Sequence, residues 1–343
     1  MSKPIQLIGL PPSPYTRKMV SLLRYRRIPY SIIWGDPSAQ LSARGIAKPK
    51  ISLLPTFLLP DEAGDLQAVC DSTPIIRRLE AEVQGRSAIP TDPALAFIDY
   101  LLEDFADEWC TKYMFHYRWH QAVDADNAGT LLPLNQKVDM GVEQLNQFKP
   151  YVTDRQVGRL HVVGSNGVTA PVIDASYRRL LAAMELHLEQ QPYLLGKRPA
   201  ASDFALYGQF TQLIGFDPTP RAIAHEISPR TVAWTGLMED QCGLDPKDDD
   251  WVCVEDSGSG LKAVLTEVGR VYPTALIANA AALQAGEKTW EAQIDGCLWT
   301  QQTFSYQGKC LQWINERYQS LTAGDQLRVD SLLDGTGCEA LLL

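Results

Sequence analysis

The segment Ser13-Pro14-Tyr15-Thr16 constrains the fold more than any other, because it joins two patterns of different period. The apolar run at residues 5–10 predicts a buried strand, and the amphipathic run at residues 17–27 predicts a helix. Ser13 is a favourable N-cap residue, and Pro14 suits the first helical turn. The sequence therefore predicts a strand that turns directly into a helix at Ser13.

The rest of the first ninety residues extends this unit in the order β-α-β followed by β-β-α. A second apolar strand is predicted at Tyr30-Ser31-Ile32-Ile33-Trp34. Two further strand-like runs flank the turn-forming residues 61–65 and predict a hairpin. Asp71 or Ser72 is then a suitable N-cap for another helix.

The position of Ser13 indicates what its hydroxyl can do. A cysteine thiolate at a helix N-terminus attacks disulfides, because the helix dipole and the free amides lower its pKa. A hydroxyl in the same place stays protonated, so it cannot attack a disulfide and can only donate its proton in a hydrogen bond to a thiolate. The segment resembles the Cys-Pro-Tyr-Cys of a glutaredoxin with hydroxyls in place of both thiols. We therefore expect Ser13 to stabilise the thiolate of a bound thiol compound.

Three motifs of this region resemble the thioredoxin-like domain of cytosolic glutathione transferases. Ser13-Pro14-Tyr15 is similar to the serine motif of the serine-type classes. Leu54-Pro55-Thr56 is similar to the segment whose cis-proline presents backbone to the cysteinyl part of glutathione, and Asp71-Ser72 to the acidic-Ser pair that holds the γ-glutamyl end. The resemblance implies Ser13 as the catalytic residue, with glutathione bound by Tyr15, Lys50, Leu54, Pro55, Asp71 and Ser72.

Alternatives remain open at several of these residues. A Ser-Pro pair alone is a common helix start, so an N-cap role is the structural alternative for Ser13. The order and spacing of all three motifs within one frame favour the glutathione site. Tyr15 and Thr16 are rival hydroxyls, although the alignment at Pro14 favours Ser13. Lys50 or Lys48 is the nearest basic residue for the glycyl carboxylate.

The resemblance implies a glutathione transferase architecture, in which a thioredoxin-like α/β domain at residues 1–86 precedes an all-α domain at residues 91–343. Residues 121–171 look like an insertion in the second domain, and residues 244–343 look like a C-terminal extension. Asp295-Gly296 between two strand-like runs predicts a small added β-hairpin within this extension. The second domain also contains a segment similar to the family's helix-opening motif. There Ala200 replaces the usual hydroxyl cap, Asp203 is kept, and Ser202 is a candidate for a shifted cap.

The long helix predicted over residues 94–120 is rich in aromatic residues. The corresponding helix in the family lines the pocket for the electrophile. The resemblance therefore implies a substrate pocket formed by Trp109, Tyr113, His116 and Tyr117. A core role is the structural alternative, because aromatic side chains dominate packing. His116 and His120 share one helical face, but no third ligand follows at a recognisable spacing, so no metal site is expected.

Charge and cysteine usage exclude some classes of function. Residues 1–90 hold 12 Lys and Arg against 7 Asp and Glu, a net of +5, while the whole chain carries −10, which leaves −15 for the remainder. This balance argues against nucleic-acid binding, whereas a basic first domain suits a small anionic ligand such as glutathione. The seven scattered cysteines and the absence of a secretory segment predict a reducing, cytoplasmic location. No apolar run approaches the roughly 20 residues of a membrane helix, so we expect a soluble protein without membrane association.

The resemblance implies a detoxifying glutathione S-transferase that uses glutathione as co-substrate and attacks a hydrophobic small-molecule electrophile. Family members are usually dimers that pair the first domain of one subunit with the second domain of the other, so we expect a homodimer. A glutathione-dependent isomerase, an ether-cleaving enzyme or a dehalogenase would use the same scaffold. A non-catalytic glutathione-binding or stress-response protein is a further alternative, because fold alone does not determine function.

Overall fold

The first domain is built around a four-stranded sheet in the order β2-β1-β3-β4. The computed structural model describes residues 4–342, and its first elements are β1 (Ile5–Gly9), α1 (Pro14–Tyr25), β2 (Tyr30–Trp34), α2 (Pro37–Ala43), β3 (Thr56–Pro60), β4 (Leu66–Val69) and α3 (Ser72–Glu82). Strand β1 pairs with β2 in parallel and with β3 antiparallel, and β3 and β4 form an antiparallel hairpin. The predicted thioredoxin-like α/β arrangement is confirmed.

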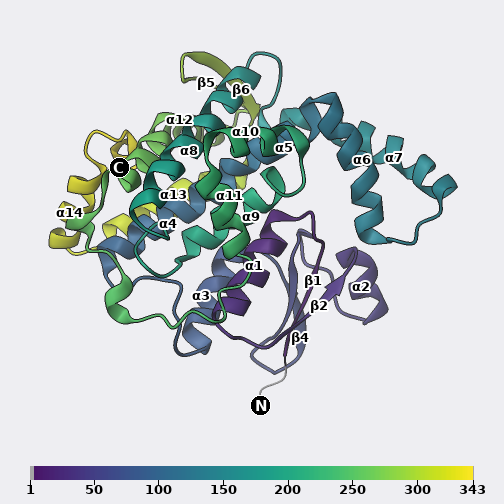
Figure 1. The fold of residues 1–343 in the computed structure, drawn as a ribbon, viewed down its shortest axis with the longest axis horizontal. Helices are drawn as coiled ribbons and strands as arrows, with labels where there is room; N and C mark the ends of the chain where they lie inside the picture. Colours follow the sequence, from purple (N-terminus) through teal and green to yellow (C-terminus); the bar gives the residue numbers. More distant parts are fainter. Residues whose placement is uncertain (1–3, 343) are drawn as a thin grey trace.

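The remainder of the chain is mostly helical, as predicted, and covers one side of the first domain (Figure 1). Its α-helices are α4 (Pro93–Glu108), α5 (Cys110–His120), α6 (Ala122–Gln136), α7 (Val142–Val157), α8 (Ala170–Gln190), α9 (Ala201–Leu213), α10 (Pro218–Ile227), α11 (Pro229–Leu237), α12 (Ser259–Gln284), α13 (Ser305–Gln319) and α14 (Ala323–Leu333). Short 3-10 helices accompany them at η1 (Leu160–Val163), η2 (Asp248–Asp250), η3 (Val254–Asp256) and η4 (Cys338–Leu341). The predicted hairpin is present as β5 (Thr289–Ile294) and β6 (Cys297–Gln302).

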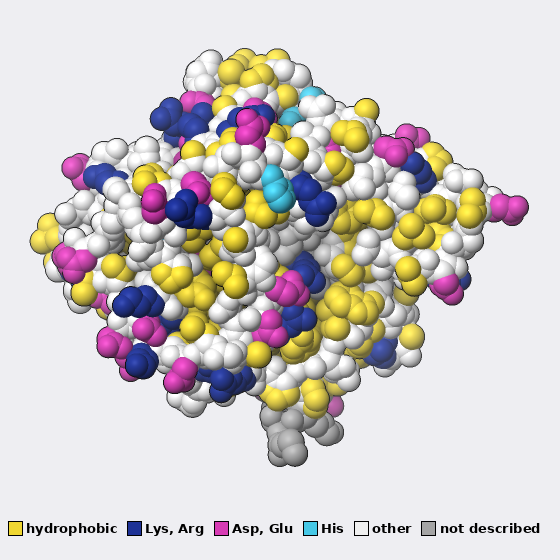
Figure 2. Space-filling model, in the orientation of Figure 1, with side chains coloured by type: hydrophobic (Ala, Val, Ile, Leu, Met, Phe, Trp, Pro, Cys, Tyr) yellow, Lys and Arg dark blue, Asp and Glu magenta, His cyan; other side chains and the backbone are white. Residues whose placement is uncertain are grey.

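The segment predicted as an insertion contains α6, α7 and η1, and α6 and α7 project from the helical body on the side of α2 (Figure 1). Trp119 and Ala125 belong to a small separate core that ties α6 to α5. Helix α7 contains no buried residue. Exposed apolar side chains, among them Val142 and Tyr151, contribute to the apolar surface on these helices (Figure 2).

Helices α1 and α9 join the two parts by packing directly against each other. Gly208 of α9 faces the first turn of α1, where a Cβ atom would overlap the carbonyl oxygen of Pro14 and lie 3.1 Å from Lys18 Cβ. Any side chain at this position would therefore push the two helices apart. The glycine permits the close approach.

Lys18 of α1 links the two parts through buried charges. Its Nζ lies 2.8 Å from Glu103 Oε1, 2.6 Å from Asp107 Oδ2 and 3.0 Å from Ser72 Oγ. Burial lowers the pKa of Lys18, but the charges of Asp107 and Glu103 outweigh burial and hold it above its usual value. Burial raises the pKa of Glu103, but Arg77, 2.6 Å away, and Lys18 outweigh that effect and lower it to about 2. These ion pairs fix α1 and α3 against α4.

Helix α9 begins directly after Ala200, and two carboxylates satisfy its first amides. Asp203 Oδ2 accepts a hydrogen bond from Ala200 N at 2.8 Å, and Asp99 Oδ1 accepts one from Ser202 N at 2.8 Å. Ser202 is therefore not a shifted cap. Asp99 of α4 supplies the acceptor that Ala200 lacks, and burial raises the pKa of both Asp99 and Asp203 to about 7.

Candidate functional site

The N-terminus of α1 presents the Ser13 side chain to a cavity between the first domain and the helical part. Ser13 Oγ accepts a hydrogen bond from Thr16 N at 3.2 Å, and Pro14 is the first residue of the helix. Because the oxygen acts here as an acceptor, the hydroxyl proton stays available for another partner. A negatively charged atom in the cavity would meet both this donor and the positive end of the helix dipole.

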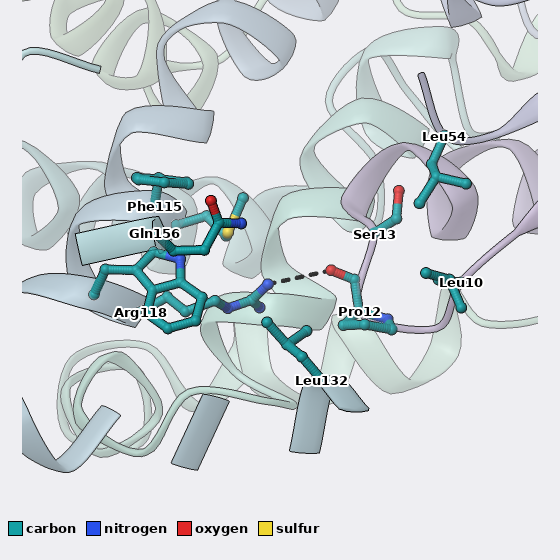
Figure 3. Close-up of a pocket in the computed structure, with 10 residues that line it drawn as sticks. Leu10, Pro12, Ser13, Leu54, Phe115, Arg118, Leu132 and Gln156 are labelled. Carbon is teal, nitrogen blue, oxygen red and sulfur yellow. Dashed lines mark hydrogen bonds between the residues drawn. The ribbon is translucent and has the colours of Figure 1, made fainter. Parts of the chain in front are cut away.

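The cavity beside Ser13 has a volume of about 200 Å³ and mainly apolar walls. Figure 3 shows Ser13 and Leu54 on one side, with Phe115 and Gln156 across from them. The first domain contributes Leu10, Pro12, Ser13 and Leu54. The helical part contributes Met114, Phe115, Arg118, Trp119, Leu132 and Gln156. Such a lining suits a small apolar group with few polar atoms.

Two polar side chains of the helical part bind the turn that carries Ser13. Arg118 Nη1 donates to Pro12 O at 3.2 Å (dashed line in Figure 3), and Gln212 Nε2 donates to the preceding proline carbonyl at 3.3 Å. Arg118 is held in turn by Asp217, whose Oδ1 lies 3.0 Å from Nε. The helical part therefore fixes the backbone just before Ser13.

The two rival hydroxyls next to Ser13 have other partners. Tyr15 donates its hydroxyl proton to Asp107 O at 2.7 Å, and burial together with nearby carboxylates raises its pKa well above the usual value. Thr16 Oγ1 accepts a hydrogen bond from Leu10 N at 3.5 Å. Of the three hydroxyl side chains, that of Ser13 lines the cavity.

The Leu54-Pro55-Thr56 motif lies beside Ser13, and a contact within the sheet connects it to the Asp71-Ser72 motif. Leu54 lines the same cavity as Ser13, and the Leu54–Pro55 peptide bond is cis, as expected. Thr56, at the start of β3, places its Oγ1 atom 3.4 Å from Cys70 Sγ, just after β4. Asp71 follows directly in the chain. The pairing of β3 with β4 thus brings the second and third motifs together.

Asp71 and Ser72, at the start of α3, are both hydrogen-bonded within the chain. Asp71 has φ 81°, a conformation that non-glycine residues rarely adopt. Tyr306 of α13 donates its hydroxyl proton to Asp71 Oδ2 at 2.8 Å, and Lys18 Nζ donates to Ser72 Oγ at 3.0 Å. Burial raises the pKa of Asp71, while the Tyr306 hydrogen bond and the Lys18 charge partly offset this effect.

The four residues expected in the substrate pocket lie in the helical core and not along the cavity beside Ser13. Trp109 packs against Trp299 of β6 with ring centroids 5.3 Å apart. Hydrogen bonds of 2.7, 2.7 and 2.6 Å join Tyr113 to Ser176, His116 to Ser165, and Tyr117 to Asp174. These contacts correspond to the structural alternative for the aromatic residues.

Another face of α5 lines the cavity, through Phe115, Arg118 and Trp119 among others. Arg118 and Trp119 follow Phe115 by three and four residues, so both lie close to Phe115 on the helix surface. The predicted single helix over 94–120 is in fact two helices, α4 and α5, which meet at Trp109. The sequence contained a signal for this face in Arg118. A charged residue among aromatic ones needs buried polar partners, so its position indicates a polar contact on this side of the helix.

The remaining candidate residues lie away from the cavity. Lys50 is exposed in the irregular segment between α2 and β3. His116 and His120 stack with ring centroids 4.5 Å apart, and burial followed by the His120 charge lowers the pKa of His116 to about 4. Within residues 4–342, no group of three or more His, Cys, Asp or Glu side chains is placed to hold a metal ion. No helix of this described part is both long and apolar enough to cross a membrane.

Several solved structures are similar to this chain at low identity. A glutathione S-transferase from Methylobacterium radiotolerans in complex with glutathione sulfonate is 17% identical over 71% of this chain and 99% of that chain, with a TM-score of 0.36. A glutathione transferase family member from Pseudomonas fluorescens with two glutathione bound is 16% identical over 68% and 86% of the two chains, with a TM-score of 0.39. A Tau class glutathione S-transferase from mango, Mangifera indica, is 15% identical over 76% and 98%, with a TM-score of 0.37.

The family comparison concerns the first domain. A search of curated proteins finds no match to the chain. Residues 7–87, by contrast, match the family model for the N-terminal domain of glutathione S-transferases. The matched stretch contains Ser13, the cis Leu54–Pro55 bond and the Asp71-Ser72 pair. Over residues 7–87, this chain is therefore similar to the N-terminal domain of glutathione S-transferases.

Proposed function

We propose that this protein is a serine-type glutathione S-transferase, in which Ser13 stabilises the glutathione thiolate for attack on a hydrophobic electrophile. The observation that carries the proposal is the Ser13 hydroxyl, which lines an apolar cavity at the N-terminus of α1. Its proton and the helix dipole both favour a thiolate over a thiol. Each unit of pKa lowering corresponds to about 1.4 kcal/mol, so two or three units would bring a thiol of pKa about 8.5 into the reactive range at neutral pH.

We assign the rest of glutathione to the other two motifs. The backbone at Leu54-Pro55, beside the cavity, would bind the cysteinyl part, and Asp71-Ser72 would bind the γ-glutamyl end. Asp71 offers a carboxylate for the ammonium group, and the first amides of α3 offer donors for the carboxylate. Lys50 is the basic residue that we assign to the glycyl carboxylate. The apolar cavity walls would receive the electrophile.

Asp71→Ala is expected to weaken glutathione binding by about 1.5 to 3 kcal/mol, or roughly 13- to 160-fold, because a hydrogen bond to a charged group is lost. Isothermal titration calorimetry measures this directly. Asp65→Ala, in the exposed β3–β4 turn, is the matched control and should bind glutathione as the wild type does. Unchanged affinity in Asp71→Ala would assign Asp71 a purely structural role.

We also propose a homodimer. The charge difference between residues 1–90 and the remainder, +5 against −15, favours contacts between the first part of one copy and the second part of the other. Light scattering at micromolar concentration should then give twice the 38.1 kDa of one chain. A mass of one chain would contradict the dimer and make the C-terminal extension the candidate for covering the interface.

A non-catalytic glutathione-binding protein is the second candidate. It is favoured by the burial of Trp109, Tyr113, His116 and Tyr117 in the helical core, which leaves the cavity beside Ser13 without the residues expected to receive the electrophile. Retention on glutathione-agarose combined with an assay of chlorodinitrobenzene conjugation separates the two functions. Retention without conjugation would support the binding protein. Conjugation that depends on Ser13 would support the transferase.

A further inference from the structure

The C-terminal tail, residues 305–342, reaches the first domain across 235 positions of sequence. The Tyr306 hydroxyl donates a hydrogen bond of 2.8 Å to Asp71 Oδ2. The next residue, Gln307, donates from Nε2 to Glu108 Oε2 of α4 at 3.2 Å. The first turn of α13 is thereby fixed to both α3 and α4.

Tyr306 is held in place by its own surroundings. Its ring packs edge-on against Trp313 with centroids 5.8 Å apart and lies 6.3 Å from the ring of Phe304. One turn further along α13, Cys310 is fully buried. Burial, together with the Asp71 charge, raises the pKa of Tyr306 far above its usual value, so the hydroxyl keeps its proton and acts as a donor. The donor is therefore positioned before any ligand arrives.

We propose that the tail completes the glutathione site within the same chain, with Tyr306 as a positioning residue that orients Asp71 toward the γ-glutamyl ammonium group. This inference rests on the proposed function. A carboxylate accepts several hydrogen bonds, so donation by Tyr306 to Oδ2 leaves Asp71 able to accept from an ammonium as well.

The charge of Asp71 supports the same role for Tyr306. An ammonium group pairs with an ionised carboxylate, but burial raises the pKa of Asp71 and so favours its neutral form. The Tyr306 hydrogen bond acts in the opposite direction and favours the ionised form. The tyrosine therefore supports both the orientation and the charge that an ammonium ligand requires.

The test compares glutathione with desaminoglutathione, which lacks the ammonium group. Tyr306→Phe removes the hydroxyl and keeps the ring, and calorimetry at pH 7 should show glutathione affinity reduced roughly 5-fold or more. Desaminoglutathione should bind the variant and the wild type equally. Tyr318→Phe is the matched control, because the Tyr318 hydroxyl donates to Asp330 Oδ1 within the tail at 2.7 Å. This control should bind glutathione as the wild type does.

A double variant isolates the coupling between the two residues. In an Asp71→Ala background, Tyr306→Phe should cause no further loss of glutathione affinity, because the residue that it positions is gone. Unchanged or tighter glutathione binding by Tyr306→Phe, or an equal loss for both peptides, would overturn the assignment while leaving the proposed function in place. A wild-type protein that fails to bind glutathione would overturn the proposed function itself, and the Tyr306 assignment with it.

Discussion

Ser13→Ala is expected to lower the rate of glutathione conjugation to chlorodinitrobenzene by about 10²-fold or more, because one preorganised donor to the thiolate is lost. Glutathione affinity should change little, since the peptide would be held mainly at Leu54-Pro55 and Asp71. The pKa of the bound thiol should rise, and ultraviolet absorbance of the thiolate against pH measures that shift.

One stability measurement and one further variant make the Ser13→Ala experiment specific. Loss of the N-cap costs about 1 kcal/mol, so Ser13→Ala should still fold, as thermal unfolding would verify. Tyr15→Phe should leave the thiolate titration unchanged, because the Tyr15 hydroxyl donates to Asp107 O. The opposite pattern, with Tyr15→Phe abolishing the titration shift and Ser13→Ala preserving it, would make Tyr15 the activating residue.

Ser13→Cys should convert the chemistry of the site. A thiolate at the N-terminus of α1 would attack oxidised glutathione, form a mixed disulfide and release one glutathione thiolate. Mass spectrometry would detect the adduct, and conjugating activity should be lost. Absence of the adduct would contradict the assignment of glutathione to this helix end.

Lys18→Met is expected to destabilise the protein by about 3 to 5 kcal/mol, because the buried Asp107 carboxylate loses its cation and Glu103 keeps only Arg77. Urea unfolding followed by circular dichroism measures the loss. Arg78→Met is the matched control. It removes a partly exposed ion pair with Glu82, which typically contributes about 0 to 1 kcal/mol.

The loss in Lys18→Met should also depend on pH. Burial already raises the pKa of Asp107 to about 7, and removal of Lys18 should raise it further. A carboxyl whose pKa is raised by folding binds its proton more tightly in the native state. Its contribution is therefore complete below the unfolded pKa of about 4 and is lost as pH rises through the folded pKa. The deficit should thus be smaller at pH 5 than at pH 8, and equal losses in Lys18→Met and Arg78→Met would contradict this account.

Local sequence signals predicted the first domain well, because its elements begin and end at residues with strong intrinsic preferences. Pro14 begins α1 directly after the cap at Ser13, and Asp295-Gly296, both with positive φ, form the turn between β5 and β6. The three glutathione motifs are each short and contiguous. Their neighbourhood follows from the pairing of β1 with β3 and of β3 with β4, and of these two pairings the sequence predicted the β3–β4 hairpin.

Features that depend on tertiary contacts could not be predicted in the same way. The face of α5 that lines the cavity depends on how α5 packs after α4 ends at Trp109, and neither the resemblance nor the sequence pattern specified that packing. The cap of α9 comes from Asp99, 103 residues away from Ser202. Neither the cavity-lining face of α5 nor the Asp99 acceptor is marked by residue spacing in the chain, so only the folded structure identifies them.

The hydrogen bond between Asp71 and Tyr306 also joins residues made at very different times. At about 5 to 20 residues per second, a ribosome needs roughly 12 to 47 s to extend the chain by the 235 positions from Asp71 to Tyr306. The first domain can fold as a unit during that interval, but Asp71 then lacks its hydroxyl partner. Every new copy of the protein therefore makes Asp71 and its neighbours early, and the hydrogen bond to Tyr306 can form only after Tyr306 has been added.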